Sequence, residues 1–331
     1  MAFHSQPPPL PPPLSPPPPC PLPQCASPEA SPPPGQNWLG KLELTYGHGD
    51  RGTTIGQSYT QAPLRLQRPF YPEGPERCQS VIVHTAGGMV GGDRLDIHLN
   101  LEPQAQAQVT TAAAAKIYRS NGPEAQQTVT AHLGAGACLE WLPQETIVFN
   151  QAQYRQQMQV ILEPGAQWLG WEVTRLGRTA MGEQFLAGNW RSRTTVYAQQ
   201  ADGSQRPLWI DRQWLPGSPE TVQSLHGLHG CPVVGSFVWL GCPGMDGVTG
   251  EVSGQLLAQA RQYWQRLLAD TEAAPAAVTQ DQAGITRLPQ GLLCRYRGHS
   301  TSRANRWFRL VWQLIRAQGS SLPAQIPRVW Q

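Results

Sequence analysis

A five-residue pattern recurs in the middle of this chain and constrains its fold more than any other feature. Its copies read LEPQA at Leu101–Ala105, LGAGA at Leu133–Ala137 and LEPGA at Leu162–Ala166, a spacing of about thirty residues. Each copy ends an alternating apolar run and turns, on a Pro or a Gly, into the next one. The recurrence predicts stacked strand-turn-strand units, as in a β-solenoid or layered sheets. Because strands and tight turns alternate in any β-protein, an unrelated β-fold stays open as the alternative.

The wider hydrophobic pattern agrees with a mainly β protein that ends in helices. Apolar residues alternate with polar ones from about residue 40 to 200; over 95–101, Leu and Ile alternate with Asp, His and Asn. Near the C-terminus the apolar spacing becomes helical, over 251–270 and again over 305–318. Residues 272–284 between them have the composition of a linker. We therefore predict a β-solenoid-like body with two flanking C-terminal helices.

The first 36 residues form a segment of different composition. They hold sixteen of the 33 prolines and no lysine or arginine. Such a segment favours polyproline II and buries too little apolar surface to offset its ordering entropy. We expect residues 1–36 to be a disordered tail, and 37–331 to form one β-rich domain. The tail has no basic start and no uninterrupted apolar run, so it does not resemble a signal peptide.

Charge and cysteine content limit the classes of partner and the cellular compartment that the sequence favours. The net charge is +3, and 23 of the 25 cations are arginine, which favours planar partners such as carboxylates. The cations are scattered in sequence, which gives no indication of nucleic-acid binding. No run approaches the ~20 apolar residues of a membrane span. Seven cysteines without a CxxC pair or an export signal are typical of reduced thiols, so we expect a cytoplasmic protein.

A glycine-rich segment, GGMVGGD at Gly87–Asp93, leads into an alternating strand. A phosphate-binding loop leads instead into a helix whose N-terminus faces the anion, so a nucleotide site is not favoured. A tight turn is one reading, and a turn that presents Asp93 to a partner or an ion is another. The next segment, TTAAAAKIYRS, carries Lys116 and Arg119 beside small residues that permit close packing. No companion base accompanies Lys116, so an interface or structural role is favoured over a nucleophile.

Two kinds of metal ligand deserve comparison. HGLHGC places His226, His229 and Cys231 close together, and soft ligands of this kind bind nickel, copper or zinc. A polar loop is the simpler reading, and no HExxH motif supports a permanent centre. The alternative ligands are carboxylates, which release nickel more readily than a His/Cys cage does. The acids near the motifs are Asp93, Glu140, Glu145, Glu172 and Glu183.

Seven segments in order resemble the urease accessory protein family UreD, also called UreH. They are PLRLQRPFYPEG (63–74), GGMVGGDRLDI (87–97), TTAAAAKIYRS (110–120), LEWLPQETIVF (139–149), WEVTRLGR (171–178), MGEQF (181–185) and PRVW (327–330). The resemblance runs from about residue 42 to 330. One departure is Ala115, where the family pattern leads us to expect a threonine before the lysine; another is the proline-rich tail, which has no counterpart.

The resemblance implies a non-catalytic scaffold that matures urease. Such a protein binds UreF and, through it, the GTPase UreG, docks on apo-urease and assists nickel insertion; UreE is a possible nickel donor. GTP hydrolysis then belongs to UreG, and nickel is handled transiently with no permanent cofactor. Asp93 and Glu172 are the implied candidates for a nickel route through the interior. The implied partner-binding or structural residues are Lys116, Arg119, Glu145, Arg178 and Glu183.

Two other functions remain open from the residues alone. A β-solenoid hydrolase acting on a polar polymer would use two of the carboxylates, and the isolated protein would then turn over substrate. A plain β-adaptor would use its arginines and twelve tryptophans only for protein contacts.

Overall fold

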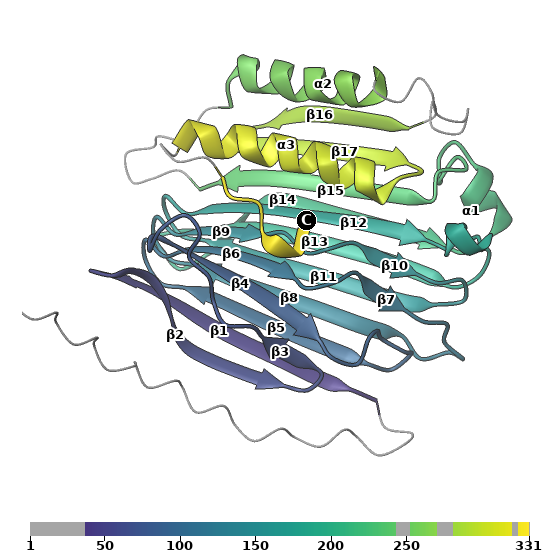
Figure 1. Ribbon diagram of the computed structural model, residues 1–331, viewed down its shortest axis with the longest axis horizontal. Coiled ribbons are helices and arrows are strands. Elements are labelled where there is room, and N and C mark those ends of the chain that lie inside the picture. Colours follow the sequence, from purple (N-terminus) through teal and green to yellow (C-terminus); the bar gives the residue numbers. More distant parts are fainter. Residues whose placement is uncertain (1–36, 243–251, 270–280, 320–323, 331) are drawn as a thin grey trace, which may run out of the picture. The chain divides into compact units, whose positions relative to one another are not determined.

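The protein folds as two facing β-sheets with helices on one side, as a computed structural model shows (Figure 1). The structure describes residues 37–242, 252–269, 281–319 and 324–330. The predicted disordered tail and most of the predicted linker lie outside these ranges. The mainly β prediction is confirmed. Among the described residues, no helix is both long and apolar enough to cross a membrane.

The two sheets, called here sheet A and sheet B, share the strands as follows. In order across sheet A, the strands are β14 (Gln205–Pro216), β13 (Asn189–Gln199), β11 (Gln153–Leu162), β8 (Ala125–Leu133), β5 (Arg94–Leu101), β1 (Leu39–Gly49) and β2 (Gly52–Gln61). Sheet B runs β16 (Gln282–Leu288), β17 (Gly291–Gly298), β15 (Val233–Gly241), β12 (Gln167–Leu176), β9 (Cys138–Trp141), β6 (Gln106–Thr111), β4 (Arg77–His84) and β3 (Leu64–Leu66). Two short strands, β7 (Ala115–Ile117) and β10 (Thr146–Val148), pair with each other, and β10 also pairs with β12.

The middle of each sheet is parallel because the chain winds through about four solenoid-like coils. Each coil passes along a strand of sheet B and returns along a strand of sheet A, so that β4, β6, β9 and β12 stack in parallel, as do β5, β8, β11 and β13. The recurring five-residue pattern forms the turns from sheet A to sheet B. This confirms the predicted stack of strand-turn-strand units.

The three recurring turns share one backbone geometry. Gln104, Gly136 and Gly165 occupy the same position, with φ of 63°, 69° and 75°. Adjacent turns are hydrogen-bonded, from Gln104 N to Ala135 O (2.9 Å) and from Gly136 N to Pro164 O (3.1 Å). The final alanine of each copy is fully buried between the sheets. The small residue is therefore required because the chain enters the core there.

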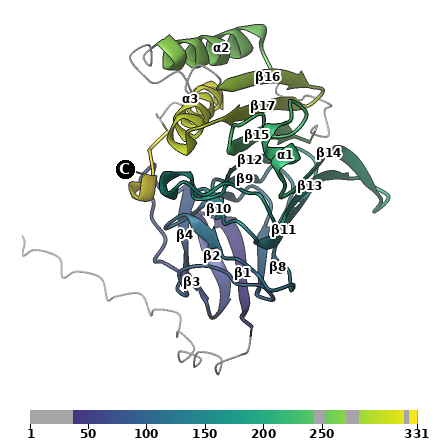
Figure 2. The same cartoon turned by 90° about the vertical axis from the view of Figure 1, so that its right-hand side faces the viewer.

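Two hydrophobic cores separate three layers. The larger core fills the space between sheets A and B and holds Leu42, Ile97, Tyr154 and Trp190. The second lies between sheet B and the helices and is rich in aromatic residues. Figure 2 shows the two C-terminal helices on the sheet B side, away from sheet A. Apolar side chains of sheet B thus face both ways, which the period-two pattern alone does not reveal.

The predicted C-terminal helices are confirmed, with shifted ends. Helix α2 spans Gly254–Ala269 and α3 spans Thr301–Gly319. Helix α3 begins four residues before the predicted start because Ser300 accepts a hydrogen bond from Arg303 N (3.1 Å), as a helix-capping residue does. The linker prediction is wrong at residues 282–284, which belong to β16 of the β16–β17 hairpin. Helices shorter than these are α1 (Pro219–Gln223) and the 3-10 turns η1 (Thr179–Met181) and η3 (Arg328–Trp330).

A buried ion network fixes the end of α3 to sheet B. Arg316 of α3 donates to Glu140 of β9 (2.8 Å) and to Glu73. Arg77 of β4 lies 3.2 Å from Glu140 and 3.8 Å from Glu73. Burial by itself raises the pKa of the Glu140 carboxyl, but Arg77 and Arg316 outweigh it and hold that pKa below its ordinary value. Four charges that neutralise one another thus join residues far apart in sequence.

Candidate functional site

Two neighbouring strands of sheet B are interrupted at the same level. The β6 strand ends at Thr111 and the chain resumes as β7, while β9 ends at Trp141 and resumes as β10. Since β6 pairs with β9 and β7 with β10, the two breaks lie side by side. Gln144 N donates across them to the Thr111 hydroxyl (2.9 Å). The breaks coincide with the sequence segments TTAAAAK and LPQET, and proline at 143 has no N–H to continue a ladder.

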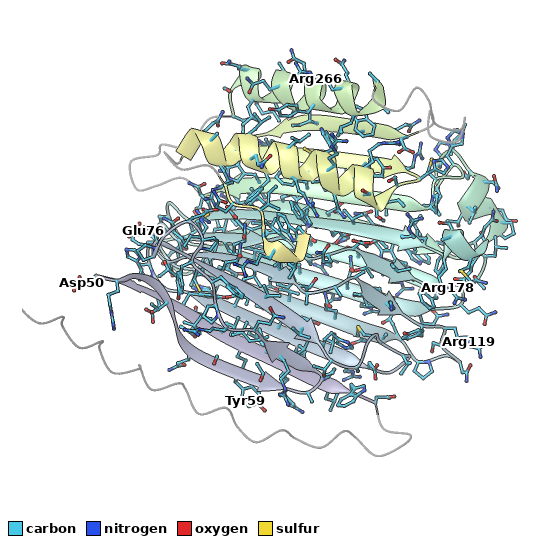
Figure 3. All side chains as sticks on the ribbon, in the orientation of Figure 1. Asp50, Tyr59, Glu76, Arg119, Arg178 and Arg266 are labelled. Carbon is cyan, nitrogen blue, oxygen red and sulfur yellow. The ribbon has the colours of Figure 1, made fainter. Side chains whose placement is uncertain are left out.

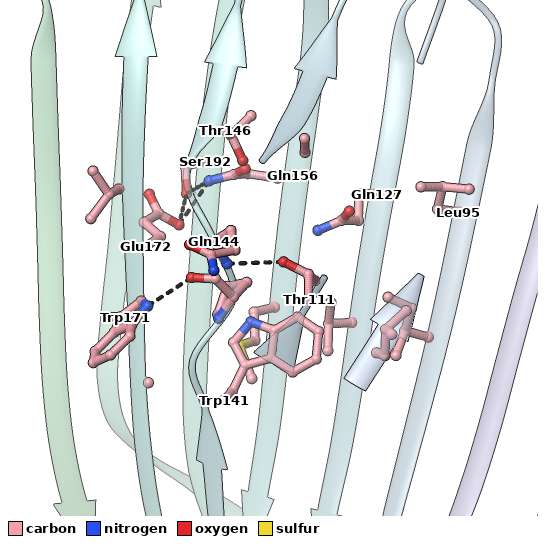
Figure 4. A pocket seen from close by; sticks show the side chains of 18 of the residues that line it. Leu95, Thr111, Gln127, Trp141, Gln144, Thr146, Gln156, Trp171, Glu172 and Ser192 are labelled. Atoms are coloured by element: carbon pink, nitrogen blue, oxygen red, sulfur yellow. Dashed lines mark hydrogen bonds between the residues drawn. The ribbon is translucent and has the colours of Figure 1, made fainter. Parts of the chain in front are cut away.

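A cavity of about 380 Å³ lies between the sheets beside these breaks (Figure 4). Its wall includes Ala112–Ala115 and Gln144 from sheet B, and Leu95 and Gln127 from sheet A. The four small residues therefore shape a cavity wall, and their backbone also pairs with neighbouring segments, from Ala112 N to Ile82 O and from Ala115 N to Glu145 O (both 2.9 Å). Much of the lining is apolar; Gln144, Gln156 and Ser192 lie on the side of Glu172, and Gln127 lies on the opposite side near Leu95.

Glu172 of β12 projects toward sheet A and is held by two of its strands. Its Oε2 accepts hydrogen bonds from Gln156 of β11 (2.8 Å) and Ser192 of β13 (3.0 Å), as Figure 4 shows. Burial raises the pKa of Glu172 to about 7, with a further increase from Asp211 that the Ser192 hydrogen bond and Arg295 oppose. The cavity therefore contains a carboxyl group that changes charge near neutral pH.

Other buried polar atoms lie on the same strands. The Tyr154 hydroxyl, the Thr174 hydroxyl and the Trp190 indole N–H have no hydrogen-bond partner among the described residues. Tyr154 interacts electrostatically with Glu172, and burial raises its pKa. Buried polar groups of this kind are normally satisfied by water or ions. The interior near Glu172 therefore offers water an indole N–H donor and two hydroxyl groups.

Asp93 lies elsewhere, at the start of β5, and is almost fully buried. Its Oδ1 accepts from Trp38 N (2.9 Å) and its Oδ2 from Val90 N (2.8 Å). Oδ2 therefore closes the glycine-rich turn and Oδ1 joins it to Trp38, and Asp93 is not among the cavity-lining residues. The turn also pairs with β7, since Met89 N donates to Lys116 O (2.8 Å).

Replacing Gly88 with alanine is expected to loosen this turn. A Cβ at Gly88 would lie 2.5 Å from Tyr118 Cε2 and 2.7 Å from Lys116 O, whereas one at Gly87 would meet nothing within 4 Å. Gly88→Ala should cost about 1–3 kcal/mol of unfolding free energy through overpacking. Gly87→Ala should cost about 1 kcal/mol, because its φ of 74° disfavours a side chain. Chemical denaturation, with hydrogen exchange at the Met89 amide, measures both; equal exchange in the two variants would contradict the clash.

The remaining motif residues form a cluster at one end of the sheets. Arg178 pairs with Glu183 and stacks over the Phe149 ring at 4.5 Å. Glu183 also accepts from Asn150 N (2.9 Å), which ties the β12–β13 loop to the β10–β11 loop. Figure 3 places Arg119 at the same end as Arg178. Lys116 and Arg119 are exposed, and Lys116 also lines the cavity.

The C-terminal segment lies against the strand breaks. Gln144 Nε2 donates to Val329 O (2.6 Å), and the Trp330 indole N–H donates to the Thr110 hydroxyl (3.0 Å). Trp330 also packs on Trp171, with ring centroids 4.9 Å apart. Glu145, beside the break, lies 3.5 Å from the Asn305 amide nitrogen of α3. Four of the seven sequence segments thus meet at the strand breaks.

The histidine-rich segment does not line this cavity. His226 and His229 lie in the β14–β15 connection, and Cys231 is buried. Within the part of the chain that the structure describes, no group of three or more His, Cys, Asp or Glu side chains is placed to hold one metal ion. The carboxylate route and the histidine site both remain predictions.

Sequence reasoning missed the partners of Glu172. Gln156 and Ser192 occupy inward positions of strands whose neighbouring inward residues are Tyr154 and Trp190. A polar residue at an apolar position of an alternating strand was the available signal. Asp211, which binds Arg295 through both oxygens (2.7 and 2.9 Å), gave no comparable signal.

Comparisons with known proteins add an independent finding. A sequence model of the family described as UreD urease accessory protein matches residues 39–331. A urease accessory protein UreD from Acaryochloris marina is 53% identical over 294 residues, which cover 89% of this chain and 95% of the relative. A urease accessory protein UreD from a Nostoc species is 51% identical over 296 residues, which cover 89% of this chain and 97% of the relative. The one from a Synechocystis species is 38% identical over 283 residues, covering 85% and 96%.

Proposed function

We propose, from the premise that this chain belongs to the UreD family of urease accessory proteins, that it serves urease maturation as a scaffold for nickel insertion. The family match across nearly all described residues carries the role in urease maturation. The finer parts of the proposal are that it binds UreF and the GTPase UreG, that this complex docks on apo-urease, and that UreE supplies nickel. The chain itself catalyses no reaction in this proposal, and its setting is the cytoplasm.

Nickel is cargo in this proposal, and the cavity beside the strand breaks is its passage. Glu172 supplies the charge and the Ser192 hydroxyl supplies a neutral oxygen beside it, while the Gln156 amide nitrogen donates to the same carboxylate. Oxygen ligands hold a divalent ion less tightly than a cage of imidazoles and thiolates holds nickel, which suits a protein that must release it. Asp93 remains a second candidate, although a metal ion there would compete with two backbone hydrogen bonds.

The decisive experiment reconstitutes apo-urease with its accessory proteins and measures bound nickel with and without this chain. Omitting the chain should leave urease nickel-poor. Full loading without it, at a nickel concentration near that of the cell, would contradict the proposed function.

Glu172→Gln is expected to lower the rate of nickel loading by about tenfold, because it keeps the shape of the side chain and removes its charge. A carboxyl with a pKa of about 7 is protonated below that pH and ionised above it. Loading by the unchanged protein should therefore rise between about pH 6 and about pH 8, and the variant should lose this rise. Elemental analysis of re-isolated urease measures both.

The matched control is Glu43→Gln, which alters an exposed carboxylate on β1. It should load urease as the unchanged protein does. If Glu172→Gln kept both the rate and the pH profile, Glu172 would not be a carboxylate of the route.

A further inference from the structure

The two strand breaks leave a gap in sheet B beside β12. Strand β12 pairs with β9 as far as Gly170 and with β10 from Thr174 onward, so within the described chain the three residues between them have no ladder partner on that side. Two of the three, Trp171 and Val173, belong to the core between sheet B and the helices, yet they line the same cavity between the sheets as Glu172 does. Because successive residues of a strand point to opposite faces, a cavity lined by all three extends into the gap.

The C-terminal segment crosses the helix side of this gap. Residues 324–330, called here the C-terminal strap, are held near their start by Glu73, whose Oε1 accepts a hydrogen bond from Gln325 N (2.8 Å). Near their end, Val329 O accepts a hydrogen bond from the side chain of Gln144, which itself lines the cavity. Figures 1 and 2 show the end of the strap beside α3, on the outer side of sheet B. The strap is thus anchored at both ends, and one anchor is a residue of the cavity wall.

Trp330 places a large ring at the gap. It is 7% exposed, and its ring packs on Trp171 with centroids 4.9 Å apart and on Trp312 at 5.6 Å. Its indole N–H donates to the Thr110 hydroxyl (3.0 Å), so the polar atom of the ring is satisfied. Arg309 of α3 lies over the ring at 5.1 Å and donates to the Trp330 carbonyl oxygen (2.9 Å). Packing and hydrogen bonds together fix the ring in one position.

The two strand residues that hold this ring flank the place where β9 stops. Strand β9 ends at Trp141, which pairs with β6 on one side and with β12 on the other. Thr110 of β6 and Trp171 of β12 directly follow the residues of those pairs. Trp330 therefore contacts both neighbours of the interrupted strand and covers the gap from the helix side.

We propose that Trp330 is a sealing residue, which closes the gap in sheet B so that an ion in the cavity cannot reach the helix side of the sheet through the strand breaks. This inference rests on the proposed function for the identity of the ion, nickel, whereas the gap and its cover come from the geometry alone. Glu172 lies at the gap, directly after Trp171 in sequence. An open gap would therefore expose a cation at Glu172 to competing ligands from the solvent. Trp330 binds no ion in this inference and acts only through the shape of the wall.

The test first measures access to the cavity in the full chain without any partner. The probe is Val129→Cys, at a position of sheet A that is 2% exposed and lines the cavity. Its reaction with the cationic reagent aminoethyl methanethiosulfonate is followed by mass spectrometry of peptides, which separates it from the native cysteines. Adding Trp330→Ala should raise the reaction rate by about tenfold, because access to a buried group follows the opening of its cover. Trp330→Phe should retain most of the protection.

The matched control is Trp307→Ala, which removes a tryptophan side chain from the same helix-side core. Trp307 is 1% exposed, and its indole N–H donates to Ala260 O of α2 (3.0 Å). At a temperature where circular dichroism shows each variant to be folded, this control should not speed the reaction at position 129. In the reconstituted loading assay at limiting nickel, Trp330→Ala should lower the nickel bound by urease by about tenfold, and Trp307→Ala should load normally.

An unchanged reaction rate in folded Trp330→Ala would overturn the inference, and so would an equal increase in Trp307→Ala, which would mean that the whole core has loosened. If Trp330→Ala does not fold, Trp330→Leu makes the same comparison, and an unchanged rate there counts equally against the seal. Normal nickel loading by Trp330→Ala despite faster labelling would overturn the role of the seal in retaining nickel.

The two proposals fail separately because the labelling needs no nickel. Faster labelling of Trp330→Ala supports the closed gap even if urease is fully loaded without this chain, a result that would contradict only the proposed function. If loading depends on the chain while the labelling rate stays the same, the seal is wrong and the proposed function stands.

Discussion

Arg316→Met is expected to lower the free energy of unfolding by about 3–5 kcal/mol, the usual loss when one member of a buried ion network is removed. Arg316 is 8% exposed and binds Glu140, which is 1% exposed, together with Glu73. Without its guanidinium, two carboxylates would share Arg77 alone inside the protein. Methionine keeps much of the side-chain volume, so the loss reports charge rather than packing.

The loss should depend on pH in a predictable direction. Because the folded pKa of Glu140 lies below its ordinary value, the stability that its ionised form contributes is present above the unfolded pKa and disappears as the pH falls through the folded one. The difference in unfolding free energy between Arg316→Met and the unchanged protein should thus be largest at neutral pH and decrease in acid. Urea denaturation at several pH values measures it. The control is Arg306→Met, an exposed arginine of the same helix, and an equal loss there would refute the network's role.

Phe308→Ala is expected to cost a similar amount, about 3–5 kcal/mol, as large-to-small changes of buried aromatic residues do. Phe308 is fully buried, and its ring lies 5.8 Å from that of Phe237 and 5.5 Å from that of Trp307. It also stacks on Trp171, at 6.5 Å, which connects α3 to the wall of the cavity. The cavity left by alanine would lie between α3 and sheet B.

Calorimetry and urea denaturation should agree on this loss. Phe308→Leu should lose less unfolding free energy than Phe308→Ala, because leucine fills part of the space that the phenylalanine ring occupied. Met181→Ala is the control, since Met181 is 78% exposed and its removal should change stability by no more than about 0.5 kcal/mol. A loss for Phe308→Ala as small as that of Met181→Ala would mean that α3 is not held by this core.

The candidate site was only partly predictable. The family resemblance implies Glu172, but the cavity that surrounds it depends on two strand breaks lying at one level. That alignment follows from the register of β6 with β9, which no local pattern specifies. The resemblance implies Asp93 for the same route, which stays a prediction, and the structure shows that both of its oxygens accept hydrogen bonds from backbone N–H groups. A carboxylate that follows glycines can accept hydrogen bonds within a turn or can bind an ion. The sequence does not show which, because the hydrogen bonds depend on where Trp38 and Val90 lie in the fold.

Patterns local to the chain specify the periodic parts of this protein. Alternation and the recurring turn of Leu101–Ala105 specify strands and their stacking, because each depends on neighbours along the chain. Helical spacing likewise specified α2 and α3 to within a few residues at their ends. The packing of coils and layers brings together residues that are distant in sequence: Gln156 and Ser192 meet Glu172, and Arg316 meets Glu140. These contacts depend on how the coils and layers pack. They join residues far apart in the sequence, and no local sequence pattern predicts such pairs.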